Sequence, residues 1–456
     1  MNNMQNQVHW SHEASIYHVF PLGLCGNRGI RSLIEWIEPA RNMGCNTLLL
    51  GPIWDSSSHG YDTKDYFRLD PRLGSEEDLV AVLQAWKRAG FRIVLDAVLN
   101  HCGRDFGPFQ DLQLKGISSI YKDWFAGVDF SKRSPCGDSF TYTAWNGCYD
   151  LVKYNHQNPA LRKYLLQVVQ HWIEHYGFDG LRLDAADVID KGFLRELARH
   201  CKSLQTDFWL LGEVVHGDYR HWLVEGELDS VTNYEVHKGL WSSCNDRNLF
   251  EIAWSLQRQY GAEGIYRNWN LLQFADNHDV NRVASVLKDP AHLVPLWIML
   301  YTIPGIPAIY YGSETGWTGC KTCNSDAPLR PEICAHQIKD GSYPELASLI
   351  AKLAHVRETH GALRSPNYAQ IDVQPEQLAY WRECVDENPV LVTINISNKQ
   401  VNYRCKLPNA KMQVGRRWVN ELNPKEAWEE TSDGLSIAMK PNSGCILSII
   451  NDASGS

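Results

Sequence analysis

The sequence lacks a long apolar run: no stretch of about 18 consecutive apolar residues, the length that a membrane-spanning helix needs, occurs among its 456 residues. The first 15 residues, MNNMQNQVHWSHEAS, carry neither the cationic segment nor the apolar segment of a secretory leader. We therefore expect no membrane partner and a cytoplasmic location.

The sequence also lacks an excess of basic residues. It has 44 Lys and Arg against 53 Asp and Glu, a formal net charge of -9, and no block of basic residues. Because nucleic acids attract positively charged surfaces, we expect no nucleic-acid partner.

A disulfide framework is missing as well. The 13 cysteines are an odd number and are scattered without the spacing of a small disulfide-rich domain, which favours reduced thiols. Two alternatives are a bridge between Cys136 and Cys148 and a zinc site in one loop, formed by Cys320, Cys323, Cys334 and His336. No second Cys-x-x-Cys pair accompanies this loop, so we favour free thiols and predict no metal.

What is present is a regular alternation of short β-rich runs and amphipathic helical stretches through about residue 360. Eight runs are candidate strands: 16–22, 47–53, 91–99, 180–184, 208–215, 230–234, 271–275 and 308–311. Eight is the number of parallel strands that closes a (β/α)8 barrel, so the sequence predicts an α/β barrel fold.

Two segments do not fit the alternation. Residues 102–157 are too long for a loop in a compact domain and are rich in Gly, Ser and aromatics, so we expect an inserted lobe after the third strand. After residue 363 short β runs, 378–382, 390–397, 401–407 and 445–449, are separated by Asn, Pro, Gly and Asp and predict an antiparallel β-sandwich domain, 364–456. The barrel is then formed by residues 1–101 and 158–363.

One candidate strand contains two charges. In the segment 178–190, FDGLRLDAADVID, Arg182 and Asp184 lie on one face of the strand, while Leu181 and Leu183 lie on the other. Buried ionised groups are costly unless they are paired or hydrogen-bonded, so we expect partners for both.

The carboxyl ends of the other strands supply such partners. In barrel enzymes these ends form the active site. The polar residues there are Tyr61, Asp62, Asp96, Asn100, His101, Arg182, Asp184, Glu213, Asn277, His278 and Asp279. Retaining cleavage of a glycosidic bond needs two carboxyl groups about 5 to 5.5 Å apart, and Asp184 and Glu213 end adjacent strands. The set therefore favours glycosidase chemistry.

Four segments carry a family resemblance: DAVLNH (96–101), GLRLDAAD (180–187), GEVVH (212–216) and ADNHD (275–279). In order and spacing they resemble the four signature regions of the α-amylase family of retaining glycoside hydrolases. Further similar pieces are HGYDTKDY (59–66), LVKYN (151–155), IPGIPAIYYGSE (303–314) and SDAPLRP (325–331), so the resemblance spans roughly residues 15 to 450.

The resemblance implies roles for individual residues. It implies that Asp184 is the nucleophile, Glu213 the general acid and base, and Asp279 the carboxylate that stabilises the transition state. Arg182 would lower the pKa of Asp184, and like charges would raise the pKa of Glu213. The residues implied to bind or shape the sugar site are Tyr61, Asp62, Asp96, His101, Arg182, His278 and Arg330.

Simpler readings stand beside several of these. Asp96 is either a hydrogen-bonding member of the site or purely structural, Tyr61 could be core packing, and His278 a loop cap. Asp187 either contacts the sugar on the leaving-group side or caps the next helix. In the inserted lobe, the aromatic side chains either line a substrate groove or belong to the core: Trp124, Trp145 and Tyr149.

LVKYN resembles a stretch of the neopullulanase, cyclomaltodextrinase and maltogenic amylase branch. That branch usually carries an N-terminal β domain used in dimerisation, whereas here the barrel starts near residue 15, so both a monomer and a homodimer stay open. Where calcium-dependent relatives often have Lys-His, this chain has Ala186-Asp187, which favours no cofactor and leaves structural calcium as the alternative.

The resemblance thus implies an enzyme that hydrolyses α-1,4 glucosidic bonds in maltodextrins or cyclic malto-oligosaccharides, with α-1,6 bonds left open. One alternative is a transglycosylase or isomerase that uses the same covalent intermediate. Another is a non-catalytic sugar-binding or scaffold relative; Asp184, Glu213 and Asp279 are all present, which argues against it.

Overall fold

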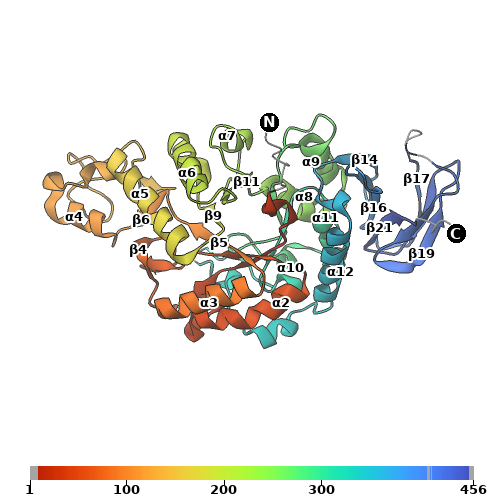
Figure 1. Cartoon of the computed structure of the whole chain (residues 1–456), viewed down its shortest axis with the longest axis horizontal. Coiled ribbons are helices and arrows are strands. Elements are labelled where there is room, and N and C mark those ends of the chain that lie inside the picture. The colour runs from red at the N-terminus through yellow and green to blue at the C-terminus, as the bar shows by residue number, and fades with distance from the viewer. Residues whose placement is uncertain (1–8, 324, 408–410, 412, 451–456) are drawn as a thin grey trace, which may run out of the picture.

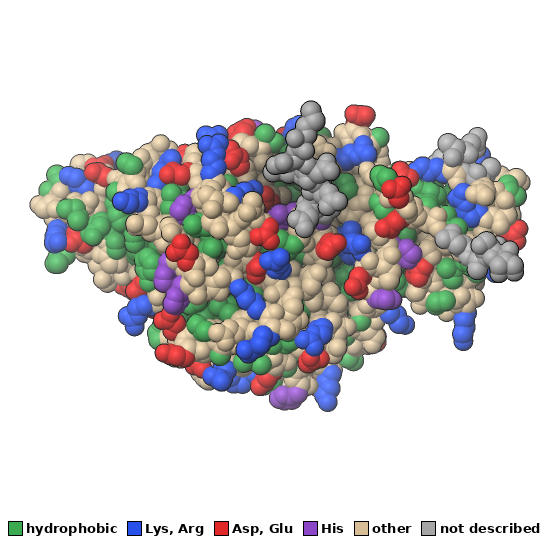
Figure 2. Space-filling view, in the orientation of Figure 1, with side chains coloured by type: hydrophobic (Ala, Val, Ile, Leu, Met, Phe, Trp, Pro, Cys, Tyr) green, Lys and Arg blue, Asp and Glu red, His purple; other side chains and the backbone are tan. Residues whose placement is uncertain are grey.

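The computed structural model describes residues 9–323, 325–407, 411 and 413–450. The predicted absence of a leader concerns residues 1–15, of which 1–8 lie outside the described residues. Within the described part, no helix is both long and apolar enough to cross a membrane. Figure 2 shows acidic and basic side chains interspersed over one face of these residues, without a continuous basic patch.

Eight parallel strands form the predicted barrel (Figure 1). Their spatial order is β11-β10-β9-β5-β2-β1-β13-β12, and a parallel bridge from Thr232 to Leu272 joins the two ends of the sheet. The strands are β1 (Ile16–Val19), β2 (Thr47–Leu50), β5 (Arg92–Ala97), β9 (Gly180–Leu183), β10 (Trp209–Gly212), β11 (Ser230–Val231), β12 (Leu272–Phe274) and β13 (Ile306–Tyr310). All eight candidate strands are therefore present.

The barrel is covered by helices on its outer side (Figure 1). They are α2 (Ile37–Asn42), α3 (Glu76–Arg88), α5 (Pro159–His171), α6 (Lys191–Leu204), α8 (Tyr234–Asn245), α9 (Phe250–Tyr260), α11 (Leu293–Thr302) and α12 (Leu346–Thr359). Shorter helices are α1 (Pro21–Leu24), α7 (Arg220–Leu223), α10 (Val283–Val286) and α13 (Gly361–Arg364).

Local sequence explains where the helix before β9 begins and ends. The Asn158 side chain accepts hydrogen bonds from the backbone N–H groups of Ala160 and Leu161, as an N-cap does, and Pro159 occupies the first turn. A π-helical turn, Trp172–Tyr176, follows α5, and Gly177 then adopts a left-handed conformation with φ of 65°. The chain is thereby turned into β9, which bears Arg182.

The segment 102–157 folds over one end of the barrel. It contains α4 (Gly107–Lys115) and a three-stranded antiparallel sheet of β6 (His101–Gly103), β7 (Ala144–Trp145) and β8 (Cys148–Lys153). A second small hairpin pairs β3 (Trp54–Ser56) with β4 (Thr63–Leu69). In Figure 1 the α4 region lies at the end of the molecule opposite to the C-terminal strands.

The chain after α13 forms the predicted antiparallel β domain. One sheet has the order β14-β15-β16-β21-β18-β19 and the second pairs β17 with β20. The strands are β14 (Tyr368–Val373), β15 (Gln377–Arg382), β16 (Val390–Asn395), β17 (Val401–Cys405), β18 (Arg417–Asn420), β19 (Asn423–Glu429), β20 (Leu435–Met439) and β21 (Ser443–Ile449). Four of them were predicted as strands, whereas β14, β18, β19 and β20 were not.

Candidate active site

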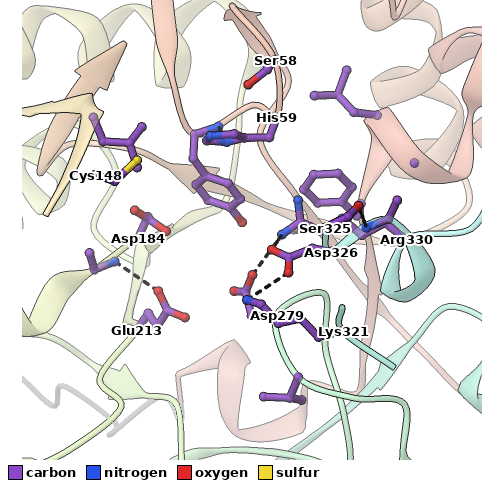
Figure 3. Close-up of a pocket in the computed structure, with 18 of the residues that line it drawn as sticks. Ser58, His59, Cys148, Asp184, Glu213, Asp279, Lys321, Ser325, Asp326 and Arg330 are labelled. Atoms are coloured by element: carbon purple, nitrogen blue, oxygen red, sulfur yellow. Dashed lines mark hydrogen bonds and ion pairs between the residues drawn. The ribbon is translucent and has the colours of Figure 1, made fainter. Parts of the chain in front are cut away.

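The predicted polar residues meet at the carboxyl ends of the barrel strands. Asp184, Glu213 and Asp279 all line one cavity of about 1440 Å³. Figure 3 shows their side chains pointing toward the same space, Asp184 and Glu213 from one side and Asp279 from the other. Asp184 and Glu213 follow β9 and β10, whose last residues, Leu183 and Gly212, are paired.

Arg182 has the partners that its burial requires. It is 3% exposed, and its strand register places it beside Asp96 of β5. Its Nη1 donates to both carboxylate oxygens of Asp96 at 2.8 Å and to Asp184 Oδ1 at 3.3 Å, while Nη2 lies 2.7 Å from Glu213 Oε1. Leu181 and Leu183 are fully buried in the main core, so both faces of the strand are accounted for.

Burial controls the protonation of the two carboxyl groups that face each other. Burial raises the pKa of Asp184 well above its ordinary value, and the adjacent Glu213 adds to this rise. Arg182 lowers the pKa of Asp184 as expected but is outweighed. Burial also raises the pKa of Glu213, and Asp279 adds to that rise against the opposing effect of Arg182. The pair therefore holds a proton more tightly than two isolated carboxyl groups.

Glu213 has two further donors. The backbone N–H of Ala185 donates to its Oε2 at 3.1 Å, and the Tyr234 hydroxyl donates to its Oε1 at 3.1 Å. Ala185 is one of the few non-glycine residues with positive φ, 47°. The left-handed conformation of Ala185 turns the chain directly after Asp184, at the residue whose N–H donates to the neighbouring carboxylate.

Asp279 lies beside the side chains of His278 and Arg330. Its Oδ2 lies 2.9 Å from His278 Nε2, and its Oδ1 accepts a hydrogen bond from Arg330 Nη2 at 3.1 Å. Although burial opposes ionisation, His278, Arg182 and Arg330 together lower the pKa of Asp279 well below its usual range. Asp279 is therefore the permanent negative charge of the cavity.

Tyr61, His101 and Arg330 line the cavity, whereas His278 does not. The Tyr61 hydroxyl donates to Asp96 Oδ2 at 2.9 Å and contacts His278 Nε2, and the two rings stack at 5.6 Å. His101 is 1% exposed, and burial lowers its pKa to about 3, so its ring is neutral. Tyr61 is thus both packed and accessible to a ligand.

Two predicted residues have structural contacts instead of cavity contacts. Asp62 accepts hydrogen bonds from the Ser58 hydroxyl at 2.6 Å and the His59 N–H at 3.1 Å, so it shapes the 58–62 loop. Asp96 accepts hydrogen bonds from Arg182 and Tyr61. Neither is among the cavity-lining residues.

The two readings of Asp187 are separated by the structure. Asp190, not Asp187, caps α6, because its side chain accepts a hydrogen bond from the Phe193 N–H. Asp187 instead is among the residues that line the cavity.

Among the lobe aromatics, Trp145 lines the cavity with its ring 5.7 Å from that of His101, while Trp124 and Tyr149 do not line it.

Several residues that line the cavity were not predicted from the sequence. They are Phe20, Ser58, His59, Arg72, Tyr234, Lys321, Ser325, Asp326 and Glu332. Tyr234 is the last residue of the sixth candidate strand, 230–234, so the rule that found Asp184 and Glu213 could have found it as well. The others lie in loops whose approach depends on tertiary packing.

All cysteines are free thiols, including Cys136 and Cys148. Among residues 9–323, 325–407, 411 and 413–450, no group of three or more His, Cys, Asp or Glu side chains could hold a metal ion. Buried Asn100 offers a single unpartnered oxygen, whereas Ca²⁺ takes six to eight.

Comparison with known proteins places this geometry in a family. The family model described as alpha amylase, catalytic domain, matches residues 26–342. Cyclomaltodextrinase of Geobacillus thermopakistaniensis is 30% identical over 421 residues, which cover 90% of this chain and 68% of that protein. Neopullulanase 2 of Thermoactinomyces vulgaris is 31% identical, with 92% and 70% covered.

A solved structure shows the same fold. Cyclic alpha-maltosyl-(1-->6)-maltose hydrolase from Arthrobacter globiformis aligns with a TM-score of 0.82 at 23% identity, covering 97% of this chain and 99% of that one. The barrel and its carboxylate-lined cavity define a glycosidase. The chain belongs to the alpha-amylase family, which confirms the predicted family and class of enzyme.

Proposed function

We propose that the chain is a retaining glycoside hydrolase that cleaves α-1,4 glucosidic bonds in maltodextrins or cyclic malto-oligosaccharides. The observation that carries this proposal is the convergence of Asp184, Glu213 and Asp279 on one cavity. Aromatic faces in the same cavity, Tyr61 and Trp145, suit sugar rings.

The proposed reaction has two steps. Asp184 attacks the anomeric carbon while Glu213 gives its proton to the leaving glycosidic oxygen, which forms a covalent glycosyl-aspartate. Glu213, now ionised, takes a proton from water, and the water oxygen displaces Asp184 from the anomeric carbon. Asp279 carries the negative charge that stabilises the oxocarbenium-like transition state.

The names of relatives support the substrate class. Relatives about 30% identical over most of this chain are named cyclomaltodextrinase, maltogenic alpha-amylase and neopullulanase 2. One relative from Bacillus subtilis, 30% identical, is named intracellular maltogenic amylase. Together with the scattered free cysteines, this name supports a cytoplasmic location for this chain.

The test is product analysis with a nucleophile variant. Wild-type protein incubated with maltoheptaose, β-cyclodextrin and pullulan should release shorter α-anomeric products, and Asp184→Asn should fold normally yet lose activity on the order of 10⁴-fold or more. Products longer than the substrate would instead favour the transglycosylase alternative. Full cleavage by Asp184→Asn would contradict the assignment.

A further inference from the structure

The direction of one hydrogen-bond chain in the site is fixed by the backbone. The Asn277 side-chain oxygen accepts from the N–H groups of Asp279 at 2.8 Å and Val280 at 3.2 Å. The Asn277 amide is 7% exposed, and these two donors settle which of its atoms is oxygen. Its Nδ2, which can only donate, therefore faces the opposite way.

The chain continues to the proposed acid. Asn277 Nδ2 donates to the Tyr234 hydroxyl oxygen at 3.3 Å. The single hydroxyl proton of Tyr234 is then free to donate to Glu213 Oε1, 3.1 Å away. Asn277 Nδ2 cannot accept a hydrogen bond, so Glu213 Oε1 is the acceptor that the Tyr234 hydroxyl proton reaches. Tyr234 therefore acts as a donor toward Glu213, since the reverse direction would leave its own buried proton without a partner.

The two oxygens of Glu213 are consequently unequal. Oε1 faces two donors, Arg182 Nη2 at 2.7 Å and the Tyr234 hydroxyl. Oε2 accepts from one donor, the Ala185 N–H at 3.1 Å. A proton on Oε1 would compete with a guanidinium and a hydroxyl proton, whereas Oε2 retains an accepting position that is free of side-chain donors.

We propose that Tyr234, oriented by Asn277, is a positioning residue that keeps the catalytic proton of Glu213 on Oε2. The inference rests on the proposed function, in which Glu213 is the general acid. It explains a feature that hydrolysis alone does not require, namely a tyrosine that joins the loop bearing Asp279 to the carboxyl group that follows β10.

The groups around Glu213 set the sign of the expected effect. Arg182 and His278 favour its ionised form, Asp184 and Asp279 oppose it, and the Tyr234 and Ala185 hydrogen bonds favour it. In Tyr234→Phe the ring keeps its packing against Phe274, with centroids 5.0 Å apart, and only the hydroxyl is lost. The ionised form loses a donor, so the pKa of Glu213 should rise.

The first experiment is a pH profile of kcat/KM on maltoheptaose. In Tyr234→Phe the basic limb should move upward by about one pH unit, since a hydrogen bond to a charged group is lost. Activity on maltoheptaose should fall by about twofold, because Oε1 keeps only Arg182 as a competing donor and takes up part of the proton. A 4-nitrophenyl maltoside, whose leaving group needs little protonation, should be cleaved at nearly the wild-type rate.

The matched control is Tyr219→Phe. Tyr219 is 2% exposed, its hydroxyl accepts from the Glu235 N–H, and it does not line the cavity. The Tyr219→Phe substitution removes a buried hydroxyl of the same kind. It should leave the basic limb of the pH profile in place. An unmoved limb in Tyr234→Phe, or an equal shift in Tyr219→Phe, would overturn the proposal.

A second readout does not depend on turnover. Infrared difference titration of the protein alone follows the carboxyl C=O band, and Glu213→Gln identifies which band belongs to Glu213. The titration midpoint should be higher in Tyr234→Phe than in wild type, and an unchanged midpoint refutes the role of Tyr234. If wild type cleaves no glucan, the proposed function fails, while this titration still decides the Tyr234 to Glu213 bond.

Discussion

At the residue scale, the charged pair in β9 is stable because the adjacent strands supply its counter-charges. Asp96 lies beside Arg182 in register, and Glu213 follows the strand on the other side. The sequence was sufficient to predict which residues meet here, since strand ends in a barrel face the same way. It was not sufficient to distinguish Asp62, whose side chain turns into its own loop, from Tyr61, which reaches the cavity.

The buried carboxyl group of Glu314, outside the cavity, gives a prediction about stability. Glu314 is fully buried, burial raises its pKa to about 7, and the Tyr17 hydroxyl donates to its Oε1 at 2.6 Å. The pKa of Glu314 is higher in the folded than in the unfolded protein, so the protonated carboxyl group stabilises the fold. This contribution to the free energy of unfolding is complete below about pH 4.5 and is lost as the pH rises through about 7.

Glu314→Gln should therefore match wild type at pH 4 and be more stable at pH 8, by about 2 to 3 kcal/mol in the free energy of unfolding. Urea denaturation at the two pH values measures this difference. The surface variant Glu263→Gln should show no such pH-dependent gain, and an equal gain in both variants would contradict the prediction.

At the element scale, the fully buried strands were the predictable ones. Every residue of β1, β2, β9 and β10 is buried, so these strands are mostly apolar, with His18 in β1 and Arg182 in β9 among the polar exceptions. The unpredicted strands β14 and β19 form the two edges of their sheet and are mostly half-buried or exposed. The β19 sequence, NPKEAWE, has no apolar pattern to detect. In β14 and β20 apolar and polar or small residues alternate, so these two strands were predictable in principle.

The hairpin of β7 and β8 brings Trp145 to the cavity. Asn146 and Gly147 both have positive φ, 46° and 76°, which is the conformation of a tight two-residue hairpin turn. Trp145→Ala should raise KM for maltoheptaose about five- to tenfold with little change in kcat, because a stacking face is lost while the carboxylates stay in place.

Steady-state kinetics measures this split between KM and kcat. Tyr149→Phe, in the same hairpin but away from the cavity lining, is the control and should leave KM unchanged. A fall in kcat without a change in KM would mean that Trp145 acts on the catalytic groups and not on sugar binding.

At the scale of the whole molecule, the C-terminal sheet shares the core of the barrel. Leu378, Tyr380, Val392 and Ile446 belong to the main hydrophobic cluster, together with side chains of α11. Arg382 of β15 is fully buried and donates to the backbone oxygens of Asn367, Leu363, Thr302 and Ser365. The sheet is thus held to the barrel by apolar contact and by polar contacts, of which those of the buried Arg382 guanidinium are the most numerous for any one side chain that the structure describes.

Arg382→Met should lower the free energy of unfolding by about 3 kcal/mol or more, because several buried carbonyl groups lose their donor. Chemical denaturation measures the loss. Arg404→Met, on the exposed side of β17, should change stability by less than about 0.5 kcal/mol. Equal losses in the free energy of unfolding for the two substitutions would contradict a role of Arg382 in holding the sheet to the barrel.

The barrel has a seam between β11 and β12, which are two and three residues long and meet at the single bridge from Thr232 to Leu272. Backbone amides on these strands should exchange with deuterated solvent sooner than those of β2 and β5. Glu213 lies on one side of the seam and Asp279 on the other. Local opening of the β11–β12 pairing would therefore change the distance between these two carboxylates. The hydrogen bonds of Asn277 and Tyr234 connect the two sides of this seam, so they help to fix the spacing of the catalytic carboxylates.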